Sequence, residues 1–191
     1  MLTGLLLIRH GEVPPSFRGR YIGRTDPPLD PAARTELERH REEFRNFAPE
    51  ALFVSPLRRA LETAEILGNH EPPFPLADPR LREIDFGDWE NLTFDEILRI
   101  APPGQIRLWA EKPEEMQFPG GESFPEFARR TEAFLAELLR RPLRRAAVVT
   151  HGGVIAHLLG QLRKHPAGET AAPPPRGSFT RLEYQNGEWI G

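Results

Sequence analysis

The alternation of short apolar runs with longer segments of helical periodicity predicts an α/β fold, a three-layer αβα sandwich around a mostly parallel sheet. Near the C-terminus, Asn186-Gly187 stands between two apolar stretches, and this dipeptide favours the type I′ turn of a β-hairpin. The sheet is therefore expected to carry an antiparallel edge strand. A chain of 191 residues suits a single domain over residues 1–191.

The predicted strands are short aliphatic runs bounded by glycine, proline or polar residues. The first, at residues 5–8, lies between Gly4 and Arg9, and its uninterrupted apolar character indicates a buried strand. The run at 146–150 has the same character and is expected at the centre of the sheet. The full set of predicted strands is 5–8, 51–54, 74–77, 146–150, 179–184 and 189–190.

Helices are predicted from apolar spacing and from capping residues. Asp30 is a suitable N-cap, and Pro31 a suitable first residue, for a helix that reaches about Phe47. Ser123 is expected to open the longest helix, over residues 124–140. The other main helices are predicted over residues 57–68 and 154–162.

Three regions depart from this regular alternation. Residues 13–31 are rich in Pro, Gly and Arg and predict a long loop of the kind that often serves function. Prolines interrupt the stretch from roughly 84 to 122, where short helices are expected over 94–100 and 106–109. This stretch is predicted to be a small helical cap inserted over the carboxyl edge of the sheet. A further proline-rich loop is expected over residues 166–177.

The composition excludes several classes of function. With 28 acidic and 25 basic residues the net charge is −3, so the chain lacks the basic surplus that binds nucleic acid nonspecifically. The absence of cysteine excludes disulfides and thiolate chemistry. The aliphatic run at residues 5–8 is too short for a signal peptide or a membrane span. A cytoplasmic protein is expected, with no nucleic acid and no membrane as partner. Its oligomeric state is open, with a homodimer as one alternative.

Two histidines follow two predicted strands directly. His10 comes after the strand at 5–8, and His151 comes after the strand at 146–150. Ligands of open α/β sheets bind outside the carboxyl ends of the strands, so neighbouring strands would bring both imidazoles into one pocket. A histidine can attack phosphorus, and nearby cations can hold the phosphoryl oxygens in the transition state. The pair therefore indicates phosphoryl transfer.

Arginines occupy positions of the same kind. Arg9 adjoins His10, and Arg58-Arg59 begins the helix that follows the strand at 51–54. A guanidinium presents a planar fork of donors that suits phosphate oxygens. The helix dipole mildly disfavours cations at a helix start, so the placement of this pair suggests a use beyond solvation.

Four short motifs occur in a fixed order along the chain: Leu7-Ile8-Arg9-His10-Gly11-Glu12, Ser55-Pro56-Leu57-Arg58-Arg59-Ala60, Leu81-Arg82-Glu83-Ile84-Asp85-Phe86-Gly87 and Thr150-His151-Gly152-Gly153. Together they resemble the histidine phosphatase superfamily, also called phosphoglycerate-mutase-like. The resemblance covers nearly the whole chain. It implies a metal-independent phosphomonoesterase of the histidine acid phosphatase type, acting on a small-molecule phosphomonoester.

The resemblance also implies a role for each pocket residue. His10 would attack phosphorus, while Arg9, Arg59 and His151 hold the nonbridging oxygens. In the family the phosphate ligand is the arginine immediately before alanine, which selects Arg59 over Arg58. Glu83 matches the carboxylate that protonates the leaving oxygen and then deprotonates the attacking water.

Other candidate groups receive different interpretations. Glu12, Asp85 and Glu90 are rival carboxylates, whose alternative roles are loop solvation or pairing with arginine, and the motif favours Glu83 over them. His157 is expected to be a packed or pairing residue on the last helix. No cofactor and no metal are expected, because protein cations supply the positive charge and no His/Asp/Glu cluster has metal-ligand spacing. The chain also lacks a Gly-x-x-x-x-Gly-Lys loop, which argues against ATP-dependent transfer.

The loop from Gly19 to Leu29, together with Val13, resembles the α-ribazole phosphatases of cobalamin synthesis. Mutases and broad-specificity phosphatases instead carry Thr or Ser at the position of Val13. The expected substrate is therefore α-ribazole 5′-phosphate, bound by Tyr21 and Gly23 of this loop and by Gly152, in addition to Arg9, Arg59 and His151 of the phosphate site. Tyr21 would stack on a flat ring, with a role as loop anchor equally open.

Other functions stay open on sequence alone. They are a broad-specificity phosphatase, a cofactor-dependent phosphoglycerate mutase, and a protein phosphatase acting on phosphohistidine or phosphotyrosine. The chain is short for such a mutase, whose cap is larger. A non-catalytic phosphate-binding or partner-binding module would be expected to have lost His10, Arg59 or Glu83, and all three are present.

Overall fold

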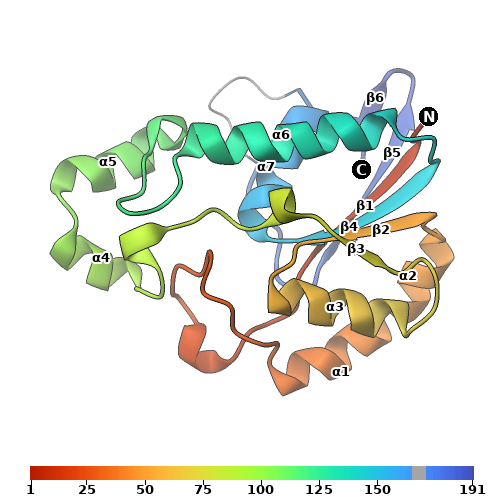
Figure 1. Cartoon of the computed structure of the whole chain (residues 1–191), viewed down its shortest axis with the longest axis horizontal. Helices are drawn as coiled ribbons and strands as arrows, with labels where there is room; N and C mark the ends of the chain where they lie inside the picture. Colours follow the sequence, from red (N-terminus) through yellow and green to blue (C-terminus); the bar gives the residue numbers. More distant parts are fainter. Residues whose placement is uncertain (165–170) are drawn as a thin grey trace.

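A mixed sheet lies at the centre of the computed structural model, which describes residues 1–164 and 171–191 (Figure 1). The strand order is β3-β2-β4-β1-β5-β6. β1 to β4 pair in parallel, whereas β5 and β6 are antiparallel additions at one edge. The predicted α/β class and antiparallel edge are therefore confirmed. The strands are β1 (Gly4–Arg9), β2 (Ala51–Val54), β3 (Pro75–Ala77), β4 (Arg145–Thr150), β5 (Phe179–Gln185) and β6 (Glu188–Ile190).

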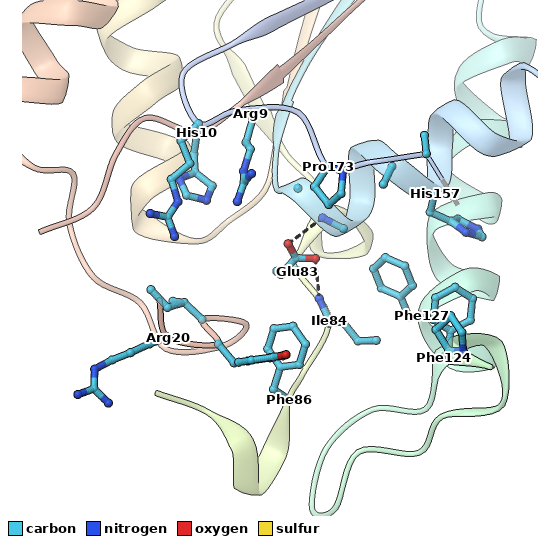
Figure 2. Close-up of a pocket in the computed structure, with 18 of the residues that line it drawn as sticks. Arg9, His10, Arg20, Glu83, Ile84, Phe86, Phe124, Phe127, His157 and Pro173 are labelled. Atoms are coloured by element: carbon cyan, nitrogen blue, oxygen red, sulfur yellow. Dashed lines mark hydrogen bonds between the residues drawn. The ribbon is translucent and has the colours of Figure 1, made fainter. Parts of the chain in front are cut away.

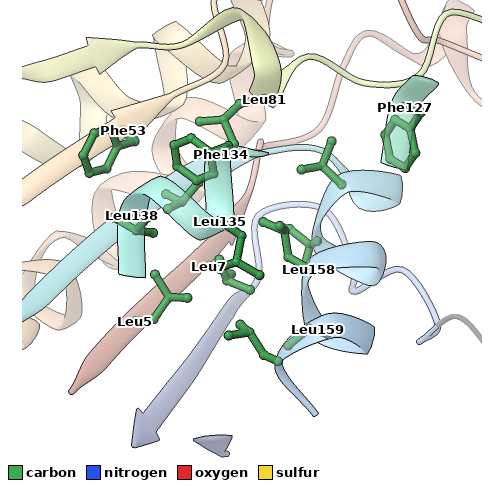
Figure 3. Close-up of a cluster of buried hydrophobic side chains, with 14 of the residues drawn as sticks. Leu5, Leu7, Phe53, Leu81, Phe127, Phe134, Leu135, Leu138, Leu158 and Leu159 are labelled. Atoms are coloured by element: carbon green, nitrogen blue, oxygen red, sulfur yellow. The ribbon is translucent and has the colours of Figure 1, made fainter. Parts of the chain in front are cut away.

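Helices cover both faces of the sheet, which gives three layers (Figure 1). Because neighbouring side chains of a strand point to opposite faces, β1 contributes to two cores. Leu5 and Leu7 face α6 and α7 (Figure 3), and Leu6 and Ile8 face α2 and α3. The helices are α1 (Pro31–Arg39), α2 (Arg41–Phe47), α3 (Arg58–Gly68), α4 (Phe94–Ile100), α5 (Pro103–Glu111), α6 (Phe124–Arg140) and α7 (Gly152–Leu162).

The register between β1 and β4 decides where the two histidines lie. Arg9 is opposite Thr150 in this parallel pair. The backbone N–H of His10 then donates to the carbonyl oxygen of Thr150 over 2.9 Å. His10 and His151 therefore leave neighbouring strands side by side, at the carboxyl edge of the sheet.

The prediction of one helix from residue 31 to about residue 47 was wrong. The segment forms two helices, α1 and α2, that meet at His40. The N–H of His40 donates to the carbonyl oxygen of Leu37, and its own carbonyl oxygen accepts from Phe44. The change of direction follows from packing, since Leu37 lies against the loop at Gly11 while Phe44 packs on the sheet. The predicted N-cap is present, because the Asp30 carboxylate accepts from a first-turn N–H over 2.8 Å.

Residues 84–122, the expected cap, contain α4 and α5, which lie beyond the carboxyl edge of the sheet (Figure 1). α5 is longer than the predicted 106–109, because Pro103 supplies a first helical residue that lacks an N–H to satisfy. At the base of this segment, the rings of Trp89 and Phe118 meet edge to face at 5.4 Å and join the main core. Its description as an insertion in a single domain stays a prediction.

The C-terminal third follows its sequence signals closely. Ser123 opens α6 with a capping box completed by Glu126. Asn186 and Gly187 link β5 to β6 with φ angles of 53° and 92°, the positive values that a type I′ turn requires. Of the loop predicted over 166–177, residues 166–170 lie outside the described residues. Residues 171–178 form an irregular segment whose N–H at Gly177 donates to the end of β1.

Candidate active site

His10 is buried at the end of β1, with one ring nitrogen committed to the backbone. Its Nδ1 lies 2.8 Å from the carbonyl oxygen of Gly11, so we assign the proton to Nδ1. The second nitrogen, Nε2, then carries a lone pair. Burial and the neighbouring cation of Arg59 lower the pKa of His10 well below its usual value, although the Gly11 carbonyl opposes this. The ring is therefore neutral at neutral pH.

Arg59 is the cation closest to that lone pair. It stands in the first turn of α3 and is 1% exposed, and its Nε donates to Nε2 of His10 over 3.3 Å. Burial lowers its pKa to about 10, so the guanidinium stays charged at neutral pH. Arg58, by contrast, is 59% exposed and pairs with Glu62 at 2.7 Å. Of the two arginines, the structure brings Arg59 to the pocket and leaves Arg58 on the surface.

The terminal nitrogens of Arg59 hold the long first loop in place. Its Nη1 donates to the carbonyl oxygen of Thr25 over 2.8 Å, and its Nη2 donates to that of Gly23 over 3.0 Å. The carboxylate of Glu90 accepts from the backbone N–H groups of residues 23, 24 and 25 and from the Thr25 hydroxyl. Glu90 therefore holds the first loop in place, and the carbonyl oxygens of that loop in turn position the Arg59 guanidinium.

His151 lies beside His10, with ring centroids 5.2 Å apart and planes tilted by 58°. Its Nε2 is 2.7 Å from the hydroxyl oxygen of Ser55, which stands at the end of β2. If that hydroxyl donates its proton, the His151 proton lies on Nδ1, which is buried and has no partner in the described part of the chain. Burial and the charge of Arg59 lower the pKa of His151 well below its usual value.

Arg9 completes the polar end of the pocket. Its Nη1 donates to the carbonyl oxygen of Pro174 over 2.6 Å. A side chain on Gly152 would place Cβ 2.9 Å from the Arg9 guanidinium carbon, so only glycine lets this arginine lie across the start of α7. Because α7 begins at Gly152, two residues before the predicted 154, the first N–H groups of the helix also face this region.

Several buried donors at this end lack an acceptor. Within residues 1–164 and 171–191, the Nε atoms of Arg9 and Arg176 and the Nδ1 of His151 are buried and have no hydrogen-bond partner. Leaving a buried donor unpaired costs about 1–3 kcal/mol. Arg9 and Arg176 both line the cavity, whereas His151 lies behind the lining beside His10. Unpaired donors of this kind suit an anion.

Glu83 lies across the cavity from these cations and is 8% exposed. Its two oxygens accept from the backbone N–H groups of Gly153 (3.0 Å) and Ile84 (3.1 Å), as the dashed lines in Figure 2 show. The first of these donors belongs to the start of α7. A Cβ on Gly153 would lie 2.6 Å from a Glu83 oxygen, so this close approach requires glycine. The carboxyl group is thus held on its side of the cavity by backbone donors, and it has no ion pair with the residues that the structure describes.

The rival carboxylates are engaged elsewhere. Glu12 pairs with Arg176 at 2.8 Å. Asp85 accepts from the N–H of Gly87 over 3.0 Å and lies 3.5 Å from the Nε of Arg24. The predicted pairing with arginine is therefore found for Glu12 and Asp85. Glu90 instead accepts hydrogen bonds from the backbone of the first loop.

A cavity of about 510 Å³ joins these groups to an apolar region. Tyr21 lines it and also anchors the first loop to the cap, because its ring meets that of Phe86 edge to face at 5.1 Å. Gly23 lies behind the lining, bonded to Glu90 and Arg59. His157 pairs with Glu132 at 3.2 Å, as predicted. The opposite wall, here called the apolar wall, consists of Ile84, Phe86, Trp109, Phe124, Phe127 and Ala156 (Figure 2).

Ser55 and Arg176 were not identified from the sequence as residues of the site, and His157, Phe124 and Phe127 were not placed in the cavity lining. Ser55 follows a predicted strand, as the two histidines do, and this position was the available signal. Across the part of the chain that the structure describes, no cluster of three or more His, Asp or Glu residues could hold a metal ion. No helix in that part is long and apolar enough to span a membrane.

A buried imidazole beside arginines with unpaired donors, with a carboxyl group across the cavity, is suited to breaking a phosphate ester bond. Residues 5–190 match the family model of the histidine phosphatase superfamily (branch 1). The chain therefore belongs to this superfamily, and it is a phosphatase.

Several relatives can be compared along most of their length. The glucosyl-3-phosphoglycerate phosphatase of Mycobacterium tuberculosis is 33% identical, over 97% of this chain and 86% of its own. The phosphoserine phosphatase 1 of Hydrogenobacter thermophilus is 30% identical, over 78% and 70%.

Solved structures agree with the fold. That of the mycobacterial glucosyl-3-phosphoglycerate phosphatase with VO3 superposes with a TM-score of 0.82, at 32% identity over 98% of this chain and 96% of its own. The α-ribazole phosphatase of Shigella flexneri superposes with a TM-score of 0.85, over 97% and 93%. At 24% identity, this second likeness concerns the fold alone.

Proposed function

We propose that this phosphatase works through a phosphohistidine at His10, without a metal, and that α-ribazole 5′-phosphate is its substrate. The phosphoryl group would occupy the polar end of the cavity, which Arg9 lines and beside which His151 packs on His10. Arg9 and His151 each have a donor nitrogen without an acceptor in the described part of the chain. Arg59 would supply a third contact. These three groups stabilise the negative charge on the nonbridging oxygens as it redistributes in the transition state.

In the first step, the lone pair on His10 Nε2 forms the N–P bond while the bond from phosphorus to the leaving oxygen breaks. Glu83, in its protonated form, gives its proton to that oxygen, and the alcohol leaves. The hydrogen bond from Nδ1 to the Gly11 carbonyl holds the ring in the required tautomer.

In the second step, water attacks the phosphohistidine from the side that the alcohol has left. Glu83, now a carboxylate, takes a proton from this water. The N–P bond breaks, inorganic phosphate leaves, and His10 recovers its neutral form. The backbone N–H groups of Ile84 and Gly153 hold the Glu83 carboxyl group in place for this step.

The apolar wall is the observation that carries the substrate proposal. It offers aromatic surface beyond the phosphate site, which suits the flat dimethylbenzimidazole ring of α-ribazole. Binding energy from a remote ring improves orientation at phosphorus and raises the specificity constant. Arg20, which also lines the cavity, bonds to Glu96 and to the carbonyl oxygen of Asn91, and Figure 2 shows it directed away from Glu83. It therefore does not offer its charge to a substrate carboxylate.

A second candidate is a phosphatase for carboxylate-bearing phosphomonoesters. It is favoured by relatives at 30–33% identity that act on glucosyl-3-phosphoglycerate and phosphoserine. Such substrates are anionic beyond the phosphate and would be expected to meet a cation there. The aromatic lining of this chain's cavity favours the α-ribazole proposal over them.

The test compares kcat/KM for α-ribazole 5′-phosphate, glucosyl-3-phosphoglycerate, phosphoserine, 3-phosphoglycerate and p-nitrophenyl phosphate in buffer with EDTA. A preference for α-ribazole phosphate of at least about tenfold, roughly 1.4 kcal/mol, is expected. A smaller preference would leave a broad-specificity phosphatase. Preference for a carboxylate-bearing substrate would support the second candidate, and efficient interconversion of 2- and 3-phosphoglycerate would indicate a mutase.

Two cap variants make the comparison sharper. Trp109 lines the cavity, whereas Phe94 is an exposed aromatic residue of the same cap. Trp109→Leu should lower kcat/KM for α-ribazole phosphate and change that for p-nitrophenyl phosphate less. Phe94→Leu should affect neither. Equal losses on both substrates with Trp109→Leu would contradict a ring site at the apolar wall.

A further inference from the structure

We propose that Arg176 is a further ligand of the transferred phosphoryl group, which it binds after releasing Glu12. This inference rests on the proposed phosphate position between His10 and Arg9. Arg176 lies outside the four motifs of the sequence, in the irregular segment 171–178 that closes one side of the cavity.

Backbone hydrogen bonds fix this segment to the strand that carries His10. The N–H of Gly177 lies 3.2 Å from the carbonyl oxygen of Arg9 and 3.0 Å from that of His10. The N–H of Arg9 in turn donates to the carbonyl oxygen of Ser178 over 3.1 Å. Arg176 is therefore held at the same strand end as the nucleophile, and not on a separate surface loop.

The guanidinium of Arg176 is only partly used by the protein. Its Nη1 donates to Glu12 over 2.8 Å, while its Nε is buried without an acceptor among the residues that the structure covers. The Arg176 side chain is 18% exposed, whereas that of Glu12 is 51% exposed. An ion pair with a half-exposed carboxylate is weak, because water competes for both partners. A buried, unpaired donor is by contrast a reason to bind an anion.

Charge explains why an incoming phosphate would displace Glu12. A phosphomonoester dianion carries twice the charge of one carboxylate and presents several acceptor oxygens. An arginine fork can contact two of these oxygens at once. Glu12 is exposed enough to be hydrated when it is released. Glu12 thus accepts a hydrogen bond from the same Arg176 guanidinium that would bind the phosphate.

A purely structural alternative is that the pair with Glu12 ties segment 171–178 to the first loop. Two neutralising variants separate the two possibilities. Arg176→Gln removes both the proposed ligand and the tie, whereas Glu12→Gln removes the tie and keeps the ligand. Arg181→Gln is the matched control, because Arg181 pairs with Glu183 at 2.8 Å on β5 and is 57% exposed.

The measurements are the inhibition constants of inorganic phosphate and orthovanadate, and kcat/KM for p-nitrophenyl phosphate. These probes do not depend on the identity of the natural substrate, so their outcome is distinguishable from failure of the α-ribazole proposal. Phosphoserine is assayed in parallel, because it carries a carboxylate. Thermal unfolding confirms that each variant is folded, and Arg176→Met, which keeps the aliphatic stem, replaces Arg176→Gln if the latter does not fold.

Arg176→Gln should raise both inhibition constants and lower kcat/KM by about tenfold to a hundredfold, the size expected for a lost charge-assisted hydrogen bond. Glu12→Gln and Arg181→Gln should stay within about twofold of the wild type, a range that corresponds to no lost hydrogen bond. Unchanged phosphate inhibition in Arg176→Gln would overturn the proposal. So would a loss in Glu12→Gln as large as in Arg176→Gln, or a loss seen with phosphoserine only.

Discussion

The Nε of Arg59 donates to the Nε2 of His10 across 3.3 Å. This contact joins an arginine proposed to bind phosphate to the proposed nucleophile. It shows that Nε2 is the acceptor nitrogen of the ring, since a guanidinium cannot accept a hydrogen bond. When phosphate binds, Arg59 can exchange this contact for a phosphoryl oxygen and leave the lone pair of His10 free to attack.

Arg59→Ala is expected to lower kcat by about a hundredfold or more, by analogy with the loss of one oxyanion donor. Arg58→Ala is the matched control, because Arg58 is the adjacent residue of the same helix but pairs with Glu62 at the surface. It should retain most of the activity. Steady-state kinetics with p-nitrophenyl phosphate measure both. A large loss in Arg58→Ala alone would show that the wrong arginine was assigned.

Glu83→Gln is expected to separate substrates by their leaving groups. An alkyl phosphate needs a proton on its leaving oxygen, whereas p-nitrophenolate departs without one. The burst rate, which reports the phosphorylation step, should therefore fall strongly for the alkyl ester and less for p-nitrophenyl phosphate. Dephosphorylation should slow for both, because the base is lost. Equal burst losses on the two substrates would argue against Glu83 as the acid.

Glu90→Gln tests whether Glu90 positions Arg59 by holding the first loop in place. The Glu90 carboxylate accepts from three consecutive N–H groups of that loop, and a carboxamide offers one acceptor oxygen in place of two. Each charge-assisted bond contributes about 1.5–3 kcal/mol. We expect a lower unfolding temperature and a lower kcat. Glu114→Gln, an exposed residue of the cap, is the control. A folded Glu90→Gln enzyme with normal kcat would contradict this role.

Stability should depend on pH through the two buried histidines. Burial and Arg59 lower the pKa of both His10 and His151 in the folded state. The unfolded chain therefore binds more protons below the ordinary histidine pKa, so stability is complete above about pH 6.5 and falls as the pH drops below it. Urea unfolding at about pH 7 and about pH 5 measures this slope. His10→Asn should flatten it, and an unchanged slope would contradict the prediction.

The sequence predicted those site residues that directly follow a strand or begin the next helix. His10, His151, Arg9 and Arg59 each stand at a strand–loop or strand–helix junction, and the structure brings these four together at one edge of the sheet. The parallel pairing of β1 with β4 joins segments that are distant in the sequence. Local sequence patterns are compatible with this pairing but do not predict it. Glu83 was found through its motif, because no periodicity distinguishes it from the other carboxylates.

The features that escaped prediction depend on tertiary packing. Arg176 meets Glu12 across 164 residues of sequence, and nothing in its local sequence encodes that distance. The break at His40 lies within a segment of continuous helical character, and two separate packing surfaces decide it. Glu90 appeared as one carboxylate among several, because its hydrogen bonds go to backbone groups of a loop whose path the sequence does not specify.

Every proposed role of the other site residues depends on the phosphorylation of His10 during turnover. Enzyme mixed with phosphorus-labelled substrate is denatured in alkali within the burst phase and then digested for mass spectrometry. We expect label that survives alkali, is lost in acid and lies on His10, with neither label nor turnover in His10→Ala. Normal turnover by His10→Ala, or label on another residue, would contradict it.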